Sequence, residues 1–134
     1  SDQVQKLAAF TSRNFDSPAV QSALNHMAGN AGHFMWPWDG AAPHSLAHGI
    51  LDDLTYDWYY LLRAVLRSGG KAEILAEGTI RDAYEKAQLH TGIPVCPTGA
   101  AGLAGLMQLQ ASGAIDRSES VGLFFTGFDR SKAG

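Results

Sequence analysis

Residues 91–113, TGIPVCPTGAAGLAGLMQLQASG, combine one reactive side chain with a run of very small ones. Cys96 can act as a nucleophile where a histidine lies nearby, although a buried, unreactive cysteine is the commoner arrangement. A glycine-rich helix that begins at Thr98 exposes backbone N–H groups that can hold an anion or a cofactor. The same glycines allow another element to pack closely against the helix, so packing and binding remain alternative explanations.

Two histidines, His44 and His48, are spaced four residues apart, as metal ligands on one face of a helix are. A proline and a glycine flank the pair, and they leave room for a short helix at best. We therefore predict no metal site here. The histidines are expected to make hydrogen bonds in a loop, where they can face a catalytic cleft.

The composition limits the classes of function. The 134 residues are 46% hydrophobic and 17% charged, which is the balance of one globular domain. A net charge of −3 provides no basic surface for nucleic acid or an anionic membrane. The single cysteine excludes an internal disulfide, and no apolar stretch approaches the roughly 20 residues of a membrane span. The opening SDQVQKLAAF lacks a signal-peptide core, so we expect a soluble, cytoplasmic protein.

Hydrophobic periodicity and capping residues predict helices that alternate with short strands. Ser17 with Pro18 marks one helix start, and Thr98 can cap another. Gly113 is expected just after the last helix. Residues 30–50 fit neither period and are predicted to form a long aromatic loop. The helices are expected near residues 1–12, 18–29, 56–67, 79–89 and 98–112, and the strands at 72–75, 93–95 and 121–127.

This alternation predicts an α/β fold with a partial, mostly parallel sheet of about three short strands, flanked by four to five helices. Residues 1–42 would form N-terminal helices with the aromatic loop, and residues 43–134 the α/β portion of one compact unit. Such a thin sheet is typical of part of a larger sheet. Its open edges and the MWPW segment of the aromatic loop favour self-association.

Four stretches follow one another along the chain: SLAHGI, WYYLLRAVLRSGG, TGIPVCPTGAAGLAGLMQL and GLFFTGFD. In this order and spacing they resemble the C-terminal half of the pyridoxal-phosphate enzymes of fold type II. This superfamily includes threonine synthase, threonine dehydratase, serine racemase and the tryptophan synthase β chain. The resemblance covers about residues 43–130.

The resemblance implies a cofactor-binding role for four residues. Thr126 matches the hydroxyl residue that hydrogen-bonds the pyridine nitrogen of pyridoxal phosphate, and Gly127 follows it. Thr98 and Gly99 match a turn that lines the active site. A neutral hydroxyl partner for the ring nitrogen suits elimination and replacement reactions on amino acids. The alternative is that Thr126 simply ends a strand and starts a turn.

The sequence departs from the family pattern in three respects. Cys96 replaces the usual glutamate and His48 the usual aspartate, so both are candidate substrate or cleft-lining residues. Neither the segment with the Schiff-base lysine nor the glycine-rich phosphate loop of the family is found. The lysines that are present fit solvated surface positions: Lys6, Lys71, Lys86 and Lys132.

The resemblance therefore implies the C-terminal fragment of a longer pyridoxal-phosphate enzyme, most like threonine synthase or a related lyase, with an amino-acid substrate. Its expected partners are the missing N-terminal portion and further copies of the same chain, and neither nucleic acid nor a membrane. We assign no catalytic residue and expect the chain alone to be inactive. Two alternatives remain open. One is a non-catalytic α/β module that binds or self-associates, and the other is a binder of phosphate ligands at the helix start near Thr98.

Overall fold

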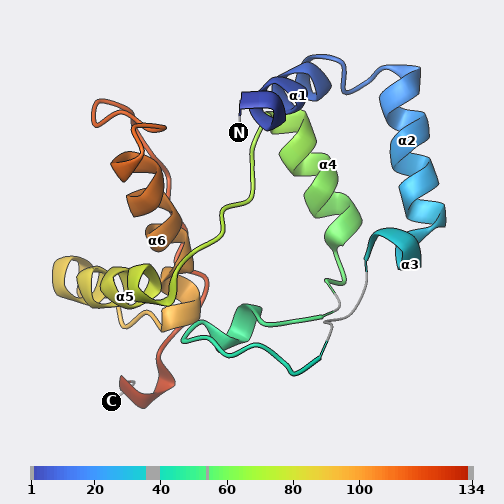
Figure 1. Ribbon diagram of the computed structural model, residues 1–134. Coiled ribbons are helices and arrows are strands. Elements are labelled where there is room, and N and C mark those ends of the chain that lie inside the picture. Colours follow the sequence, from blue (N-terminus) through green and yellow to red (C-terminus); the bar gives the residue numbers. More distant parts are fainter. Residues whose placement is uncertain (1, 36–39, 54, 133–134) are drawn as a thin grey trace. The chain divides into compact units, whose positions relative to one another are not determined.

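The computed structural model describes residues 2–35, 40–53 and 55–132, and this part of the chain is helical (Figure 1). The chain divides into two compact units, Ser1–Ala41 with Asp53–Ala72, and Ala42–Asp52 with Glu73–Gly134. We call them the first unit and the second unit. The first contains α1 (Asp2–Arg13), α2 (Pro18–Gly29), α3 (Ala31–Phe34) and α4 (Trp58–Ser68). The second contains the 3₁₀ turn η1 (His48–Ile50), α5 (Glu77–Thr91), α6 (Pro97–Ala111) and the 3₁₀ turn η2 (Arg130–Lys132).

The predicted α/β fold is wrong, because the described residues form no sheet. Residues 72–75 and 121–127 are not helical, as expected, but neither segment pairs as a strand. Val95 and Phe128 form an isolated bridge, and it is antiparallel where parallel strands were predicted. The sheet prediction failed at the pairing step, since an apolar run of strand length becomes a strand only when another strand lies beside it.

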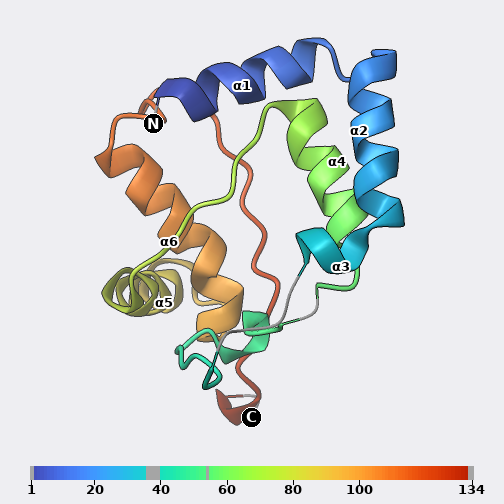
Figure 2. The ribbon, with the colours of Figure 1, turned by 45° about the vertical axis from the view of Figure 1, so that its right-hand side comes forward.

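Two helices cover the apolar surface that a sheet was expected to cover. Ala83 and Ala87 of α5 and Ala100 and Ala104 of α6 are all buried where the two helices pack together. Their short side chains let the helix backbones approach closely, and Figure 2 shows α6 crossing α5. The small-residue stretch therefore serves helix packing, which is one of the two explanations considered for it.

The first unit is held together around a buried phenylalanine. Phe15 is 4% exposed, and the guanidinium of Arg63 lies 5.2 Å from the centre of its ring. The same guanidinium lies 5.6 Å from the ring centre of Tyr59 and donates a hydrogen bond of 3.1 Å to Gln21 Oε1. Through Arg63, helix α4 therefore contacts both α2 and Phe15, which lies just after α1.

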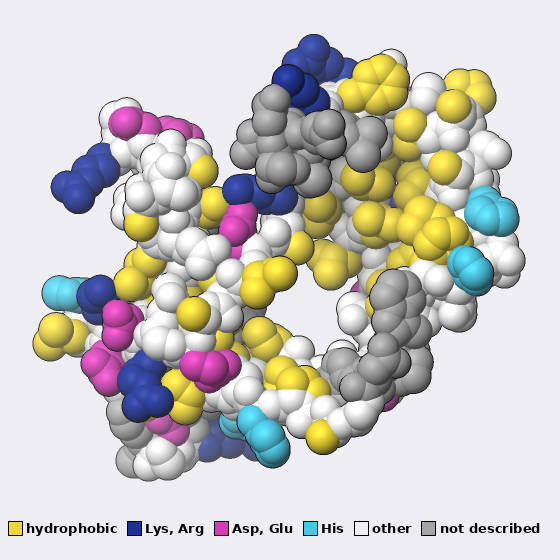
Figure 3. Space-filling view, viewed as in Figure 1, with side chains coloured by type: hydrophobic (Ala, Val, Ile, Leu, Met, Phe, Trp, Pro, Cys, Tyr) yellow, Lys and Arg dark blue, Asp and Glu magenta, His cyan; other side chains and the backbone are white. Residues whose placement is uncertain are grey.

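An apolar pocket of about 400 Å³ lies in the first unit beside α4. Figure 3 shows hydrophobic side chains gathered at the surface over α4 and α2. Residues 36–39 of the predicted aromatic loop, with both of its tryptophans, lie outside the described residues. The pocket is lined by Met27, Phe34, Met35, Thr55, Trp58, Leu61, Leu62, Val65 and Ala72.

Local signals in the sequence located the helix ends well. Ser17 Oγ accepts a hydrogen bond from the Val20 N–H, as its predicted capping role requires. Gly113 follows α6 with a φ of +72°, a left-handed conformation that glycine adopts without strain. The unit boundary expected after residue 42 differs in the structure, where residues 53–72 join the first unit because α4 packs against α1. None of the described helices has both the length and the apolar composition to cross a membrane.

Candidate functional site

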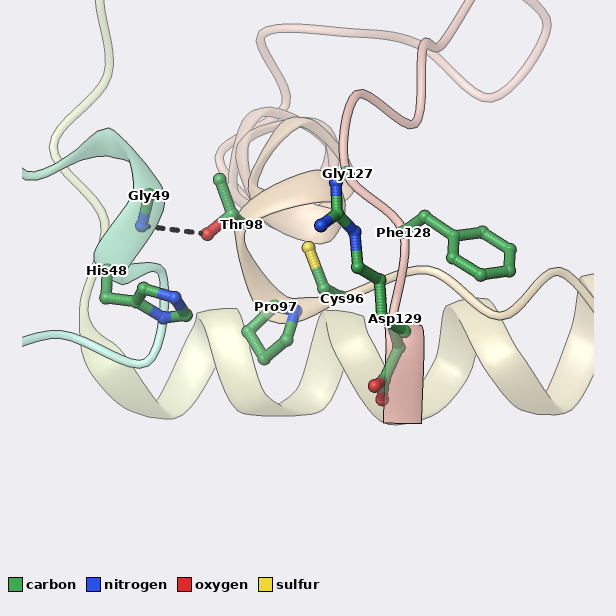
Figure 4. Close-up of a pocket in the computed structure, with 9 residues that line it drawn as sticks. His48, Gly49, Cys96, Pro97, Thr98, Gly127, Phe128 and Asp129 are labelled. Atoms are coloured by element: carbon green, nitrogen blue, oxygen red, sulfur yellow. Dashed lines mark hydrogen bonds between the residues drawn. The ribbon is translucent and has the colours of Figure 1, made fainter. Parts of the chain in front are cut away.

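An open pocket of about 460 Å³ lies in the second unit at the beginning of α6 (Figure 4). Three segments that are far apart in the sequence build it: the η1 turn, the residues at the start of α6, and residues 127–130, which lead into η2. Its volume falls within the usual range of small-molecule sites. The lining residues are His48, Gly49, Cys96, Pro97, Thr98, Gly127, Phe128, Asp129 and Arg130.

Backbone hydrogen bonds join two of these segments. The Cys96 N–H donates to the Gly127 carbonyl at 3.2 Å, and the Asp129 N–H donates to the Pro94 carbonyl at 2.8 Å. These bonds flank the antiparallel bridge between Val95 and Phe128. The pairing is short, but it fixes the C-terminal segment against the entry to α6.

Gly99 and Gly127 explain why so little side-chain bulk stands at this helix start. A Cβ atom on Gly99 would lie 2.5 Å from the backbone nitrogen of Gly127 and 2.7 Å from Val95 Cγ2. A Cβ atom on Gly127 would lie 2.5 Å from Cys96 Sγ and 3.0 Å from the Gly99 nitrogen. Only glycine fits at position 99, because the backbone of Gly127 cannot move aside as the end of a flexible side chain can. At position 127 the added atom would meet the Cys96 side chain, which would have to shift.

The residue that caps α6 is Cys96, so the prediction that Thr98 caps this helix is wrong. Pro97 takes the first helical position, where its missing N–H costs nothing, and the cap therefore falls one residue earlier. Cys96 Sγ accepts a hydrogen bond from the Gly99 N–H at 3.4 Å. This bond uses one of the few N–H groups at the helix start, which weakens the phosphate-site interpretation.

Thr98 bridges α6 to the η1 turn instead. Its Oγ1 accepts a hydrogen bond from the Gly49 N–H at 3.1 Å, drawn as the dashed line in Figure 4. The hydroxyl of Thr98 can still donate its own proton to a ligand. The figure also shows the Phe128 ring directed away from Thr98, so that this aromatic group borders the pocket without filling it.

The structure brings together most of the residues that the sequence singled out. His48, Cys96, Thr98 and Gly127 all line the pocket. Gly99 contacts the backbone of Gly127 just beneath it. Thr126 is exposed and is not among the lining residues, although it directly precedes Gly127 in the chain.

Asp129 and Arg130 also line the pocket, but neither was predicted as a site residue. Asp129 Oδ2 accepts a hydrogen bond from the Tyr84 hydroxyl of α5 at 3.2 Å, and Oδ1 accepts one from the Ser131 hydroxyl. Asp129 is the last residue of the GLFFTGFD stretch, and its place in that stretch could have identified it as a site residue. Nothing in the sequence identifies Tyr84 as a partner of the site, because its helical spacing predicts only a core-facing residue.

The two histidines that were considered as a metal pair line different pockets. His48 lines the pocket at α6, whereas His44 lines a separate one with Glu73 and Glu77. The described residues contain no group of three or more histidine, cysteine, aspartate or glutamate side chains that could hold a metal ion.

The pocket at α6 thus presents an imidazole, a thiol, a hydroxyl, a carboxylate and a guanidinium, while none of its nine lining residues is a lysine. Such a set can orient a polar small molecule by hydrogen bonds and charge. Comparisons of the chain with protein-family models, with curated proteins and with solved structures found no match.

Proposed function

We propose that the second unit forms one wall of the cofactor site of a pyridoxal-phosphate enzyme. The enzyme would act on an amino acid by elimination or replacement, as threonine synthase and related lyases do. One observation supports this proposal above the others. Three of the four stretches that resemble the family, residues 45–50, 91–109 and 122–129, contribute to a single pocket.

The pocket and the residues next to it suit one edge of the cofactor. Thr126 is exposed beside Gly127, so its hydroxyl is accessible to a ring nitrogen. The close contact of Gly99 and Gly127 keeps side-chain bulk away from the place where a flat ring would lie. No lysine lines the pocket, so the residue that holds the cofactor covalently would come from the N-terminal portion of the enzyme.

The cofactor and the residues of the second unit would contribute differently to the reaction. When bound, the cofactor serves as an electron sink for the substrate after its α-proton is lost. In this proposal Thr126 binds the ring nitrogen and Thr98 offers a hydroxyl to the ligand. His48 and Cys96 contribute an imidazole and a thiol to the walls.

Exposed apolar side chains support the proposed partners. Ile74 is 94% exposed and Phe124 84% exposed, although both belong to apolar segments. In this proposal each of these side chains is covered by another polypeptide, either the N-terminal portion or a second copy of the chain. The proposal includes a cytoplasmic enzyme, in keeping with Cys96 as the only cysteine in the sequence.

The full-length product of the gene that encodes residues 1–134 provides the test. We expect it to bind pyridoxal phosphate and, after borohydride reduction, to carry the cofactor on a lysine outside this segment. Residues 1–134 alone should retain no cofactor after reduction and gel filtration. In the full-length product, Thr126→Val should lower cofactor retention about tenfold through loss of a hydrogen bond. The control Thr79→Val, in α5 and outside the pocket, should leave it unchanged.

Two results would overturn this proposal. One is a full-length product that binds no pyridoxal phosphate. The other is attachment of the cofactor to a lysine within residues 1–134, namely Lys6, Lys71, Lys86 or Lys132.

A non-catalytic self-association module is the second candidate function, and the exposed side chains of Ile74 and Phe124 favour it. It predicts that residues 1–134 form a stable oligomer without any cofactor and that Phe124→Asp dissociates it. Sedimentation velocity measures both. A monomeric chain that is unaffected by Phe124→Asp would rule this candidate out.

A further inference from the structure

The loop 45–49 connects the first turns of α5 and α6 through two hydrogen bonds. At one end, the Leu46 N–H donates to Glu77 Oε2 at 2.9 Å, and Glu77 is the first residue of α5. At the other end, the Gly49 N–H donates to Thr98 Oγ1 at 3.1 Å, and Thr98 is the second residue of α6. The two anchors lie on opposite sides of His48, which lines the pocket.

Burial of Ala47 makes this stretch a defined structural element. Ala47 is fully buried and packs with Ile80 and Ala83 of α5 and with Ala104 of α6. Its N–H donates to Ser45 Oγ at 3.0 Å, which tightens the turn before η1. The loop is thus fixed in its middle by packing and on each side by one hydrogen bond.

We propose that Glu77 is a positioning residue, which holds the loop 45–49 so that His48 and Gly49 form a wall of the pocket at α6. The positioning role rests on the proposed function only for the identity of the ligand that the pocket binds. Only two residues lie between the two anchors, a span of at most about 10 Å, so a displacement of Leu46 also displaces Gly49. Glu77 acts through the loop and touches no ligand.

The electrostatics of Glu77 agree with this role. The Leu46 N–H and the Ser45 hydroxyl hold the pKa of Glu77 below its usual range, and Arg81 lowers it further. The side chain is therefore a carboxylate at neutral pH, which is the stronger acceptor for a backbone N–H.

Glu77 also has a simpler role that must be separated from positioning. A negative charge in the first turn of a helix stabilises the helix itself. Glu77→Gln distinguishes the two roles because the amide oxygen can still accept the Leu46 N–H, whereas the charge is gone. Glu77→Ala removes both, and Glu85→Ala is the control because Glu85 is an exposed glutamate of the same helix.

Amide hydrogen exchange of residues 1–134, followed by NMR, tests the proposal. We expect Glu77→Ala to speed exchange at Gly49 by about threefold, the effect of losing one exposed charged contact. Exchange at Ala83 and Ala104, in the helix interiors, should change much less. Glu77→Gln should restore most of the Gly49 protection, and Glu85→Ala should leave it unchanged.

A double-mutant cycle with Thr98→Val adds a test of coupling. If Glu77 acts on Gly49 through the loop, the effects of Glu77→Ala and Thr98→Val on Gly49 exchange are less than additive. Equal effects of Gln and Ala at position 77, or an unchanged Gly49 rate, would overturn the proposal. If Glu77→Ala fails to fold, Glu77→Gln alone decides: protection of Gly49 close to that of the parent chain supports positioning, and its loss refutes it.

These outcomes are separate from those that concern the cofactor. Exchange at Gly49 is measured on residues 1–134 without any ligand, whereas the proposed function is tested by cofactor retention in the full-length product. A loosened Gly49 in Glu77→Ala together with a full-length product that binds no cofactor would support positioning and refute the enzyme. A full-length product that binds the cofactor, with Gly49 unaffected by Glu77→Ala, would support the enzyme and refute positioning.

Discussion

The backbones of Gly99 and Gly127 lie in direct contact at the start of α6, so closely that a Cβ atom on Gly99 would overlap the backbone of Gly127. One glycine belongs to the helix and the other to the C-terminal segment, 28 positions later in the numbering. Their contact holds the two segments that contribute most of the pocket lining. A side chain at position 99 would therefore push these two segments apart.

Gly99→Ala is expected to destabilise the chain by about 1–3 kcal/mol, because the added methyl group meets the backbone of Gly127. Gly105→Ala is the matched control, since nothing lies within 4 Å of a Cβ atom there. That change should stabilise α6 by up to about 1 kcal/mol, the helix preference of alanine over glycine. Urea unfolding followed by circular dichroism measures both. Changes of the same sign at the two positions would contradict the packing seen here.

The helices could be predicted from the sequence, whereas the sheet could not. Ser17 and Gly113 mark helix ends through contacts with residues a few positions away, and such signals are local. The apolar run 121–127 predicts a strand, but pairing depends on segments far away in the sequence. Here α5 and α6 bury each other through alanines, so no sheet is needed to cover them.

The candidate site was predictable to a similar extent. His48, Cys96, Thr98 and Gly127 were singled out from the sequence, and they line one pocket. Their separate roles were harder to predict. The cap was misassigned because α6 begins at Pro97, one residue before Thr98, and this start is known only from the structure. The hydrogen bond between Tyr84 and Asp129 depends on how α5 packs against the C-terminal segment.

The cap of α6 gives a prediction for Cys96. Cys96→Ser should preserve or improve stability, because a serine hydroxyl is a better acceptor for the Gly99 N–H than a thiol. Cys96→Ala removes the acceptor and should cost about 0.5–2 kcal/mol. Thermal unfolding of the two variants compares them directly. Equal midpoints for serine and alanine would mean that Cys96 does not cap the helix.

The contact between Glu77 and Leu46 gives a pH dependence. Because the pKa of Glu77 is lowered in the folded chain, its stabilising effect is complete above the usual glutamate pKa. This stabilising effect is lost as the pH falls from the usual glutamate pKa to values below the lowered pKa of Glu77. The chemical shift of the Leu46 amide proton should follow this titration, with a midpoint below the ordinary glutamate range. Other charged or titratable groups near Glu77 are Arg81, His44 and Glu73.

A second carboxylate provides the control for this titration. The Ser118 N–H donates to Asp116 Oδ1 at 2.8 Å, and Ser118 lowers the pKa of Asp116. Glu77→Gln should abolish the titration of the Leu46 amide and leave that of the Ser118 amide intact. A Leu46 shift that still titrates in Glu77→Gln would show that another group is responsible.

Arg63 gives a prediction for the first unit. Its guanidinium lies over the rings of Phe15 and Tyr59 and also donates to Gln21, so Arg63→Ala should cost about 1–2 kcal/mol. Arg63→Lys should recover only part of this loss, because an ammonium group lacks the planar shape that spans both rings.

Arg13→Ala is the control for Arg63→Ala. Arg13 is exposed in α1, and its replacement should change stability by a few tenths of a kcal/mol. Amide exchange at Leu24, which is 2% exposed in α2, reports on this unit alone. Full recovery by lysine would show that charge, and not the geometry of the guanidinium, holds α4 in place.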